Sequence, residues 1–186
     1  MYFGGIWGGQ LQRWRNGVFN PNNPTSPTAF LPNDDEPALL PFVAKMSDDL
    51  LEFAEKPGEV QILDERGKLL LAGDNERRFF EAAWVHKYNG KYYFSYSTGD
   101  THFICYAIGD NPYGPFTYKG KILNPVVGWT SHHSICEFKG KWYLFYHDSS
   151  LSKGVTHLRS IKIAEIQYDK DGLIRTLEPY NDFSIL

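Results

Sequence analysis

Cysteine, excess basic charge and long apolar runs are all scarce in this sequence of 186 residues. Two cysteines, Cys105 and Cys136, are too few for a disulfide scaffold or a cysteine-rich zinc site, and their strand-like surroundings predict reduced core residues. A net charge of −3 excludes the strongly basic surface of a nucleic-acid-binding protein. No apolar run approaches the roughly 20 residues of a membrane helix, and no signal-peptide pattern opens the chain. We therefore expect neither a nucleic-acid nor a membrane partner.

Aromatic residues are abundant instead. The chain has 12 Tyr, 13 Phe and 5 Trp, together with 17 Gly and 11 Pro. This mixture favours short strands joined by tight turns over long helices, and it predicts the all-β class. The length is that of one ordinary domain.

An internal repeat is the strongest feature of the sequence. Residues 84–96 and 134–146 both read as strand, two-residue turn, strand, with turns that end at Gly90 and Gly140. A short glycine turn between alternating apolar runs predicts a β-hairpin. The two hairpins are offset by 50 residues, and aromatic hairpins repeated every 40 to 50 residues or so are typical of β-propeller blades.

Each blade is expected to hold four antiparallel strands, the first of them next to the central channel. At about 50 residues per blade the chain accommodates about three and a half blades, whereas closed propellers have roughly 4 to 8. Residues 2–5 resemble the end of a hairpin whose first strand would precede residue 1. We therefore expect residues 1–186 to form a single incomplete β-propeller domain that lacks its first blade and part of its second. Such a domain has open edges through which it could form a homo-oligomer.

The region before the repeat is less regular. Residues 20–41 are rich in proline and predict a loop insertion. Residues 42–44 and 58–63 predict two short strands.

Glu81 is the first candidate for chemistry, because it stands alone among Phe79, Phe80, Ala82 and Trp84. An apolar setting helps a carboxyl group to keep its proton, as a general acid near neutral pH must. A solvent-facing glutamate at the entry of a strand is the alternative, and the residues alone leave it open.

The 50-residue offset relates Glu81 to Ser131, which is followed by His132 and His133. Equivalent positions on neighbouring blades converge on the same end of the axial channel, and polar groups that converge on one pocket are typical of an active site. Because adjacent strand residues face opposite ways, at most one of the two histidines can face the channel. We expect Glu81, His132 and Arg159 to line one pocket.

Arg159 lies in the alternating stretch 157–163, where an inward-facing guanidinium could bind a hydroxyl or a carboxylate. Trp7 and Trp129 have glycine neighbours, which leave an indole uncovered as a platform for a sugar ring. A solvated arginine and ordinary packing of both indoles are the alternatives. We assign Arg159, Trp7, Trp129 and His133 to substrate binding.

Several motifs together resemble one family. They are Phe80-Glu81-Ala82, Gly90-Lys91-Tyr92-Tyr93, Ser131-His132-His133-Ser134, Gly140-Lys141-Trp142-Tyr143 and Leu158-Arg159-Ser160. In this order, along nearly the whole chain, they resemble glycoside hydrolase family 43, and in particular its β-xylosidases and α-L-arabinofuranosidases. The resemblance implies part of a five-bladed β-propeller. It also implies an inverting hydrolase that releases xylose or arabinofuranose from plant cell-wall oligosaccharides of the xylan or arabinoxylan type.

The resemblance further implies roles for individual residues. Glu81 matches the catalytic general acid, and Arg159 matches the substrate-binding arginine. His132 matches the histidine that ligates or orients a calcium ion and its waters on the propeller axis. Family members also use two aspartates, a general base and a modulator of the acid, at positions before the equivalent of Met1. We expect this chain to lack both aspartates and to hydrolyse glycosides negligibly when isolated.

Two functions compete with hydrolysis. One is a non-catalytic sugar-binding propeller, and the other is a structural propeller fragment that oligomerises through its exposed face. The missing aspartates favour these for the chain taken alone, whereas Glu81, His132 and Arg159 favour an enzymatic origin. The sequence does not separate a xylosidase from an arabinofuranosidase. It leaves the localisation open, with the cytoplasm slightly favoured.

Overall fold

The chain folds almost entirely into β-structure. A computed structural model describes residues 1–6, 10–15, 18–23, 31–129 and 131–180. The elements in these ranges are β1 (Tyr2–Phe3), the single-turn 3-10 helix η2 (Leu11–Arg13), β2 (Trp14–Arg15), β3 (Val18–Phe19), β4 (Phe42–Val43), β5 (Gly58–Glu59), β6 (Ile62–Leu63), β7 (Glu81–Tyr88), β8 (Lys91–Ser97), β9 (Ile104–Gly109), β10 (Phe116–Leu123), β11 (His133–Phe138), β12 (Lys141–Asp148) and β13 (Ser160–Ile166). Within them, no helix is long and apolar enough to cross a membrane. The expected all-β class is confirmed.

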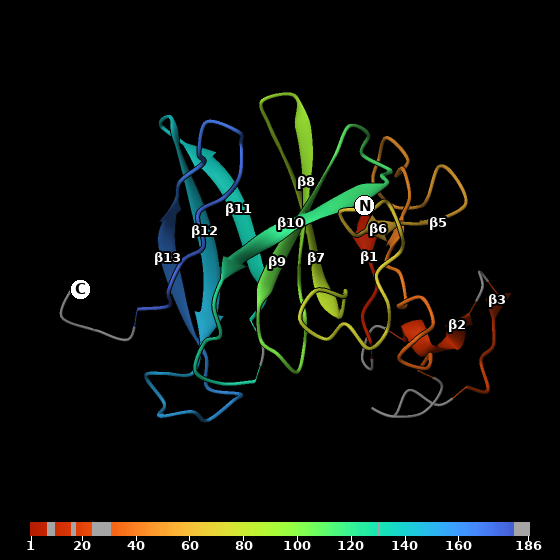
Figure 1. Cartoon of the computed structure of the whole chain (residues 1–186), viewed down its shortest axis with the longest axis horizontal. Coiled ribbons are helices and arrows are strands. Elements are labelled where there is room, and N and C mark those ends of the chain that lie inside the picture. Colours follow the sequence, from red (N-terminus) through yellow and green to blue (C-terminus); the bar gives the residue numbers. More distant parts are fainter. Residues whose placement is uncertain (7–9, 16–17, 24–30, 130, 181–186) are drawn as a thin grey trace.

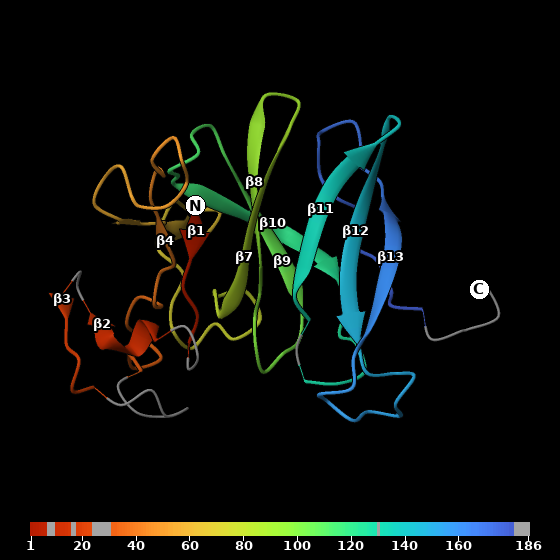
Figure 2. The same ribbon diagram turned by 180° about the vertical axis from the view of Figure 1, so that it is seen from behind.

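Three main sheets lie side by side (Figures 1 and 2). The central sheet is the antiparallel meander β7–β8–β9–β10, and β6 joins β10 as a parallel fifth strand. The sheet β1–β4–β5 flanks it on one side and the sheet β11–β12–β13 on the other, and β7 contacts both β1 and β11. The strands β2 and β3 form a separate two-stranded ribbon (Figure 1).

Both predicted hairpins are present, and their turns explain the glycines. In the β7–β8 turn, Asn89 and Gly90 have φ of 46° and 79°, and in the β11–β12 turn Lys139 and Gly140 have φ of 52° and 78°. Positive φ at both central residues defines the type I′ turn, whose twist matches that of the flanking strands. The 50-residue repeat is therefore a repeat of structure as well as of sequence.

The central sheet is buried on both faces, because its side chains alternate between two cores. Phe94 and Tyr96 of β8 enter the core shared with β1–β4–β5, whereas Tyr93 enters the core shared with β11–β12–β13. Cys105 and Tyr106 of β9 divide in the same way. Successive strand residues face opposite sides of a sheet, so apolar residues at nearly every position of β8 and β9 require a neighbour on each side.

The sheet β11–β12–β13 is buried on one face only. Leu144 and Tyr146 of β12 enter the core beside the central sheet. On the opposite face, Ile161 and Ile163 of β13 are 80% and 50% exposed, and Ile163 pairs with Phe145 of β12. We call this surface, formed by Ile161, Ile163 and Phe145, the outer face. It is apolar and open to solvent.

Three details of the expected fold need correction. The predicted strand 58–63 consists of two strands, β5 and β6, which belong to different sheets. The flanking sheets hold three strands each in the described residues, and after β13 the chain bridges at Leu177 to Leu123 of β10. Cys105 is a free thiol in the core as expected, but Cys136 is exposed because β11 places it on the same side of the sheet as the outer face.

The packing between the central and last sheets predicts a pH dependence of stability. His86 of β7 lies in this layer, where its Nε2 is 2.7 Å from the hydroxyl of Tyr168, and burial lowers its pKa to about 4. In the unfolded chain a histidine titrates near pH 6.5. Between about pH 6.5 and pH 4, therefore, the unfolded state carries more bound protons than the folded state. The free energy of unfolding should therefore fall as pH drops from about 6.5 towards 4, by up to about 1.4 kcal/mol per pH unit for this group.

Urea unfolding between pH 7 and pH 4.5 measures this slope. His86→Phe should flatten it by the share of one histidine, whereas His157→Phe, at an exposed position, should leave it unchanged. Equal slopes in both variants would show that His86 does not contribute.

Candidate active site

Glu81 stands at the start of β7 and pairs there with Ser97, the last residue of β8. Between Glu81 and Trp84 the register with β8 slips by one residue, and Ala82 has a φ of 63°. This is a β-bulge, a device that bends a strand and redirects the side chains beside it. The Glu81 side chain is 24% exposed, so its carboxyl group is partly buried and still open to a ligand.

His132 reaches Glu81 from the neighbouring sheet. It directly precedes β11, and its Nε2 lies 3.4 Å from Glu81 Oε1. β7 and β11 are also joined by the indole of Trp84, whose Nε1 donates a hydrogen bond to the Ile135 carbonyl at 3.2 Å. The structure thus brings together the first two residues that were expected to share a pocket.

Arg159 joins this pair through His147, which lies near the end of β12. The backbone N–H of His132 donates to His147 Nε2 at 3.0 Å, and Arg159 Nη1 lies 3.3 Å from the same nitrogen. Burial, followed by the charges of Arg159 and His132, lowers the pKa of His147 to about 4, so its ring is neutral at pH 7. Glu81, His132, His147 and Arg159 therefore form one continuous cluster.

A buried ion pair lies beside this cluster. Lys162 Nζ on β13 is 2.5 Å from Asp148 Oδ2 on β12, and both side chains are almost fully buried. Burial opposes ionisation of Asp148, but hydrogen bonds from Lys162 and Ser150 outweigh it and hold the Asp148 pKa below its usual value. Since Asp148 follows His147 and Lys162 follows Arg159 by three positions, the pair fixes β12 and β13 where the cluster needs them.

His147 was missed at the level of sequence, although a signal for it was present. The 50-residue offset that relates Glu81 to Ser131 also relates Ser97 to His147. In the central sheet Glu81 pairs with Ser97, and in the sheet β11–β12–β13 Ser131 exchanges hydrogen bonds with the backbone of His147, at 2.7 and 3.2 Å. The same two positions are therefore occupied by polar residues in both sheets.

The other predicted binding residues have different surroundings. His133 reaches the central sheet instead, where its Nε2 lies 2.7 Å from the hydroxyl of the buried Ser95. Burial, followed by the neighbouring His132 and His86, lowers the His133 pKa to about 3. Trp129 is 38% exposed and packs edge-to-face on His102, with ring centroids 5.3 Å apart. Trp7 lies outside the described residues, and substrate binding by these side chains stays a prediction.

The residues around His132 do not match a calcium cage. Calcium prefers about six to eight oxygen ligands, whereas His132 offers one nitrogen that already lies against Glu81. Within the ranges that the structure describes, no group of three or more His, Cys, Asp and Glu side chains could hold a metal ion. The metal-binding role of His132 therefore also stays a prediction.

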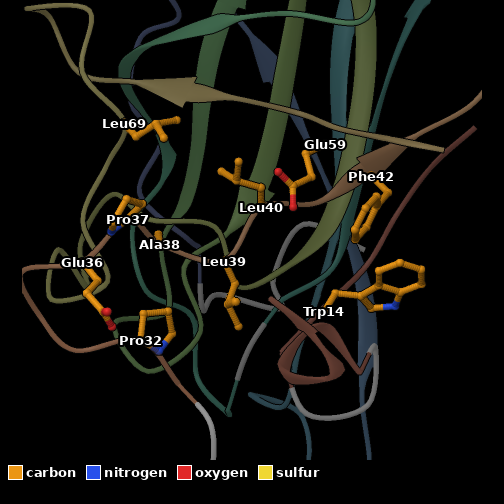
Figure 3. A pocket seen from close by; sticks show the side chains of 10 residues that line it. All are labelled: Trp14, Pro32, Glu36, Pro37, Ala38, Leu39, Leu40, Phe42, Glu59 and Leu69. Carbon is orange, nitrogen blue, oxygen red and sulfur yellow. The ribbon is translucent and has the colours of Figure 1, made fainter. Parts of the chain in front are cut away.

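A separate cavity of about 250 Å³ lies by the sheet β1–β4–β5 (Figure 3). Its lining includes Trp14, Phe42 and Glu59, and Figure 3 shows the Trp14 indole and the Phe42 ring next to each other at one end. Neither Glu81 nor Arg159 is part of this lining. The cavity is therefore distinct from the cluster of Glu81, His132, His147 and Arg159.

The fold and the cluster define a β-propeller protein with a partly buried carboxyl group where two inner strands begin. The pattern of glycosyl hydrolases family 43 matches residues 42–174, and the chain belongs to this family. This membership and the structural similarities below confirm the expected partial five-bladed propeller.

Relatives with known names agree with this family. The chain is 65% identical over 178 residues to a xylosidase/arabinosidase of Bacteroides ovatus, covering 96% of this chain and 53% of that protein. It is 59% identical over 178 residues to a β-xylosidase of Xylanibacter ruminicola, covering 96% of this chain and 54% of that protein. The chain thus spans about half the length of the curated relatives it matches.

Solved structures show the same fold. The structure of RS223-β-xylosidase has a TM-score of 0.89 and 66% identity, covering 96% of this chain and 53% of that one. A family 43 β-xylosidase/α-arabinofuranosidase from a compost metagenome has a TM-score of 0.90 and 65% identity, covering 97% of this chain and 54% of that one. The latter is described as a calcium-free form in complex with xylotriose.

The bulge at Ala82 generates a testable prediction about how Glu81 is held. A left-handed conformation costs a non-glycine residue about 1–2 kcal/mol. Ala82→Gly should therefore leave the free energy of unfolding unchanged or raise it by up to about 1 kcal/mol. Ala83→Gly, one position further along β7, should lower it by about 0.5–1 kcal/mol. Urea unfolding of both variants checks this, and equal destabilisation would contradict the bulge.

Proposed function

We propose that this chain carries the general-acid half of an inverting glycoside hydrolase that acts on xylan- or arabinoxylan-type oligosaccharides. In this proposal, residues 1–186 form one incomplete propeller domain. Glu81 protonates the glycosidic oxygen of the departing sugar, and Arg159 binds a hydroxyl of the xylose or arabinofuranose unit. The observation that carries the proposal is the contact of Glu81 Oε1 with His132 Nε2 at 3.4 Å, in one cluster with Arg159.

The cluster suits the chemistry of an acid catalyst. Glu81 is partly buried beside Phe80 and Ala83, which pack with the core, and yet a quarter of its side chain reaches solvent. Such a carboxyl group can approach a glycosidic oxygen directly. Arg159 is exposed and donates its Nε–H to the Thr156 carbonyl at 2.8 Å, so its Nη groups remain near the cluster. A fixed guanidinium beside the acid provides orientation for a polar ligand.

Inversion needs a second carboxylate roughly 6.5 to 9.5 Å from the acid, on the other side of the scissile bond. Asp148 is the other acidic group that acts electrostatically on His147, and its carboxylate is bound by Lys162. It therefore cannot serve as the base. In the proposal the base and the modulating aspartate are not supplied by residues 1–186.

Calcium enters only as an expectation from the family resemblance. It would be bound by His132 and by water molecules on the propeller axis. The residues around His132 do not form a calcium cage. The proposed roles of Glu81 and Arg159 therefore involve no metal ion.

The proposal predicts the activity of the chain by itself. Loss of a general base typically lowers rates by about 10² to 10⁴. Purified residues 1–186 should hydrolyse 4-nitrophenyl xyloside and arabinofuranoside negligibly. The same chain preceded by about 100 further residues of its own protein, intended to supply the expected missing blade and a half, should be active. Equal turnover by both would contradict the assignment of the missing carboxylates.

In the longer polypeptide, Glu81→Gln should lower turnover of xylobiose far more than that of aryl glycosides, whose leaving groups need little protonation. Glu52→Gln, in an exposed surface turn, is the matched control.

A second function, self-association, is favoured by the outer face. Ile161 and Ile163 are exposed side by side on a face that is already apolar. An exposed apolar sheet face is typical of an interaction surface. In this alternative, a second copy of the chain covers the outer face and the protein acts as a sugar-binding or structural module.

Size-exclusion chromatography with light scattering tests this alternative. If the outer face is the interface, the mass should rise with concentration, and Ile161→Lys should restore a monomer. Leu51→Lys, at an exposed apolar loop residue outside the sheets, should not change the mass. A monomer at all concentrations would exclude self-association.

A further inference from the structure

His147 lies between His132 and Arg159 in the cluster. Its Nε2 lies 3.0 Å from the backbone nitrogen of His132 and 3.3 Å from Arg159 Nη1. Both of these groups are obligatory donors, because a backbone amide and a guanidinium have no acceptor on nitrogen. The atom between them must therefore be an acceptor, and the ring must hold its proton on Nδ1.

The backbone of His147 is held in place by its neighbours, and its ring lies near another imidazole. The hydroxyl of Ser131 donates to the His147 carbonyl at 2.7 Å and accepts from its N–H at 3.2 Å. The next residue, Asp148, is tied to β13 by Lys162 at 2.5 Å. The ring of His132 also lies nearly parallel to that of His147, at 6.1 Å between centroids and 21° between planes. The position of His147 is thus fixed by both neighbouring strands.

Arg159 is an exposed side chain, so its orientation depends on its hydrogen bonds. Its guanidinium has two hydrogen-bond partners, the Thr156 carbonyl for Nε at 2.8 Å and His147 Nε2 for Nη1 at 3.3 Å. Two anchors fix the plane of a rigid group and direct its remaining N–H donors outwards. Without the second anchor, the guanidinium could rotate about the first.

We propose that His147 is a positioning residue, whose unprotonated Nε2 orients the Arg159 guanidinium and the His132 backbone so that both face the sugar bound beside Glu81. This inference rests on the proposed function, because it gives Arg159 a sugar hydroxyl as ligand. The ligand class is a neutral pentose with adjacent hydroxyls. The recognition needs oriented donors rather than charge.

The surroundings of the two ring nitrogens agree with this role. In the Nδ1–H tautomer one buried N–H has no hydrogen-bond partner among the described residues, whereas the other tautomer would set two donors against an N–H. The geometry alone therefore selects the Nδ1–H tautomer.

NMR of the ¹⁵N-labelled 186-residue chain at neutral pH tests the positioning role directly. In the unaltered protein we expect a non-protonated Nε2 and a protonated Nδ1 for His147, and slowly exchanging signals for both Nε–H and Nη1–H of Arg159. A protonated Nε2 in His147 would overturn the proposal. This readout does not depend on the folding of any variant.

Two variants separate positioning from packing. His147→Gln keeps an acceptor at similar reach, and it should retain the Arg159 Nη1 signal. His147→Phe keeps a ring but no acceptor, so the Nη1 signal should vanish while the Nε signal persists through Thr156. Persistence of the Nη1 signal in His147→Phe would overturn the proposal. His157→Gln, at an exposed histidine on the loop before β13, is the control and should change nothing.

Titration with D-xylose and L-arabinose then connects positioning to binding. The dissociation constant should be the same for the unaltered chain and His147→Gln, and about tenfold weaker for His147→Phe, the size expected for a disordered donor to a ligand. If the unaltered chain binds neither pentose, the proposed function fails for this chain, and the Arg159 signals alone decide the positioning role. Equal affinity of all variants, with sugar bound, would show that His147 does not orient the site.

Discussion

Burial of both faces of the central sheet is the constraint on which the rest of the structure depends. Phe94 and Tyr93 are neighbours on β8, and each needs its own core. The sheet therefore cannot be stable without one sheet on each side, and the two neighbours are held with their inner strands against β7. This packing places the start of β11 beside the start of β7. The contact of His132 with Glu81 follows from it, because each residue lies at the beginning of one of those strands.

Repetition of one hairpin supplies the geometry of the site, and divergence between the copies supplies its chemistry. The positions occupied by Glu81 and Ser97 in one blade are occupied by Ser131 and His147 in the next. A repeat that kept the same side chains would place two carboxyl groups or two imidazoles together. With different side chains, an acid from one blade meets a histidine-rich set from the other. The bulge at Ala82 then adjusts the direction of the acid without disturbing the core strands behind it.

Much of this could be predicted from the sequence, because the relevant signals are local. Asn89-Gly90 and Lys139-Gly140 define the turns, and the offset between them defines the repeat. The division of residues 58–63 between two sheets could not be predicted, since the parallel pairing of β6 with β10 joins segments more than 50 residues apart. The positioning role proposed for His147 could not be identified from residue type alone. Its role depends on which nitrogen faces His132 and Arg159, and that is a property of the assembled blades.

The central claim is that the proposed sugar site lies between Glu81 and Arg159, where β7 and β11 begin. The alternative place is the aromatic cavity of Figure 3. A crystal structure of the chain with bound xylose tests this claim most directly. The account predicts density for the sugar within hydrogen-bond distance of the Glu81 carboxyl group and the Arg159 guanidinium, with His147 Nε2 still facing Arg159. Density for the sugar against Trp14 and Phe42 instead, with the Glu81 cluster empty, would contradict it.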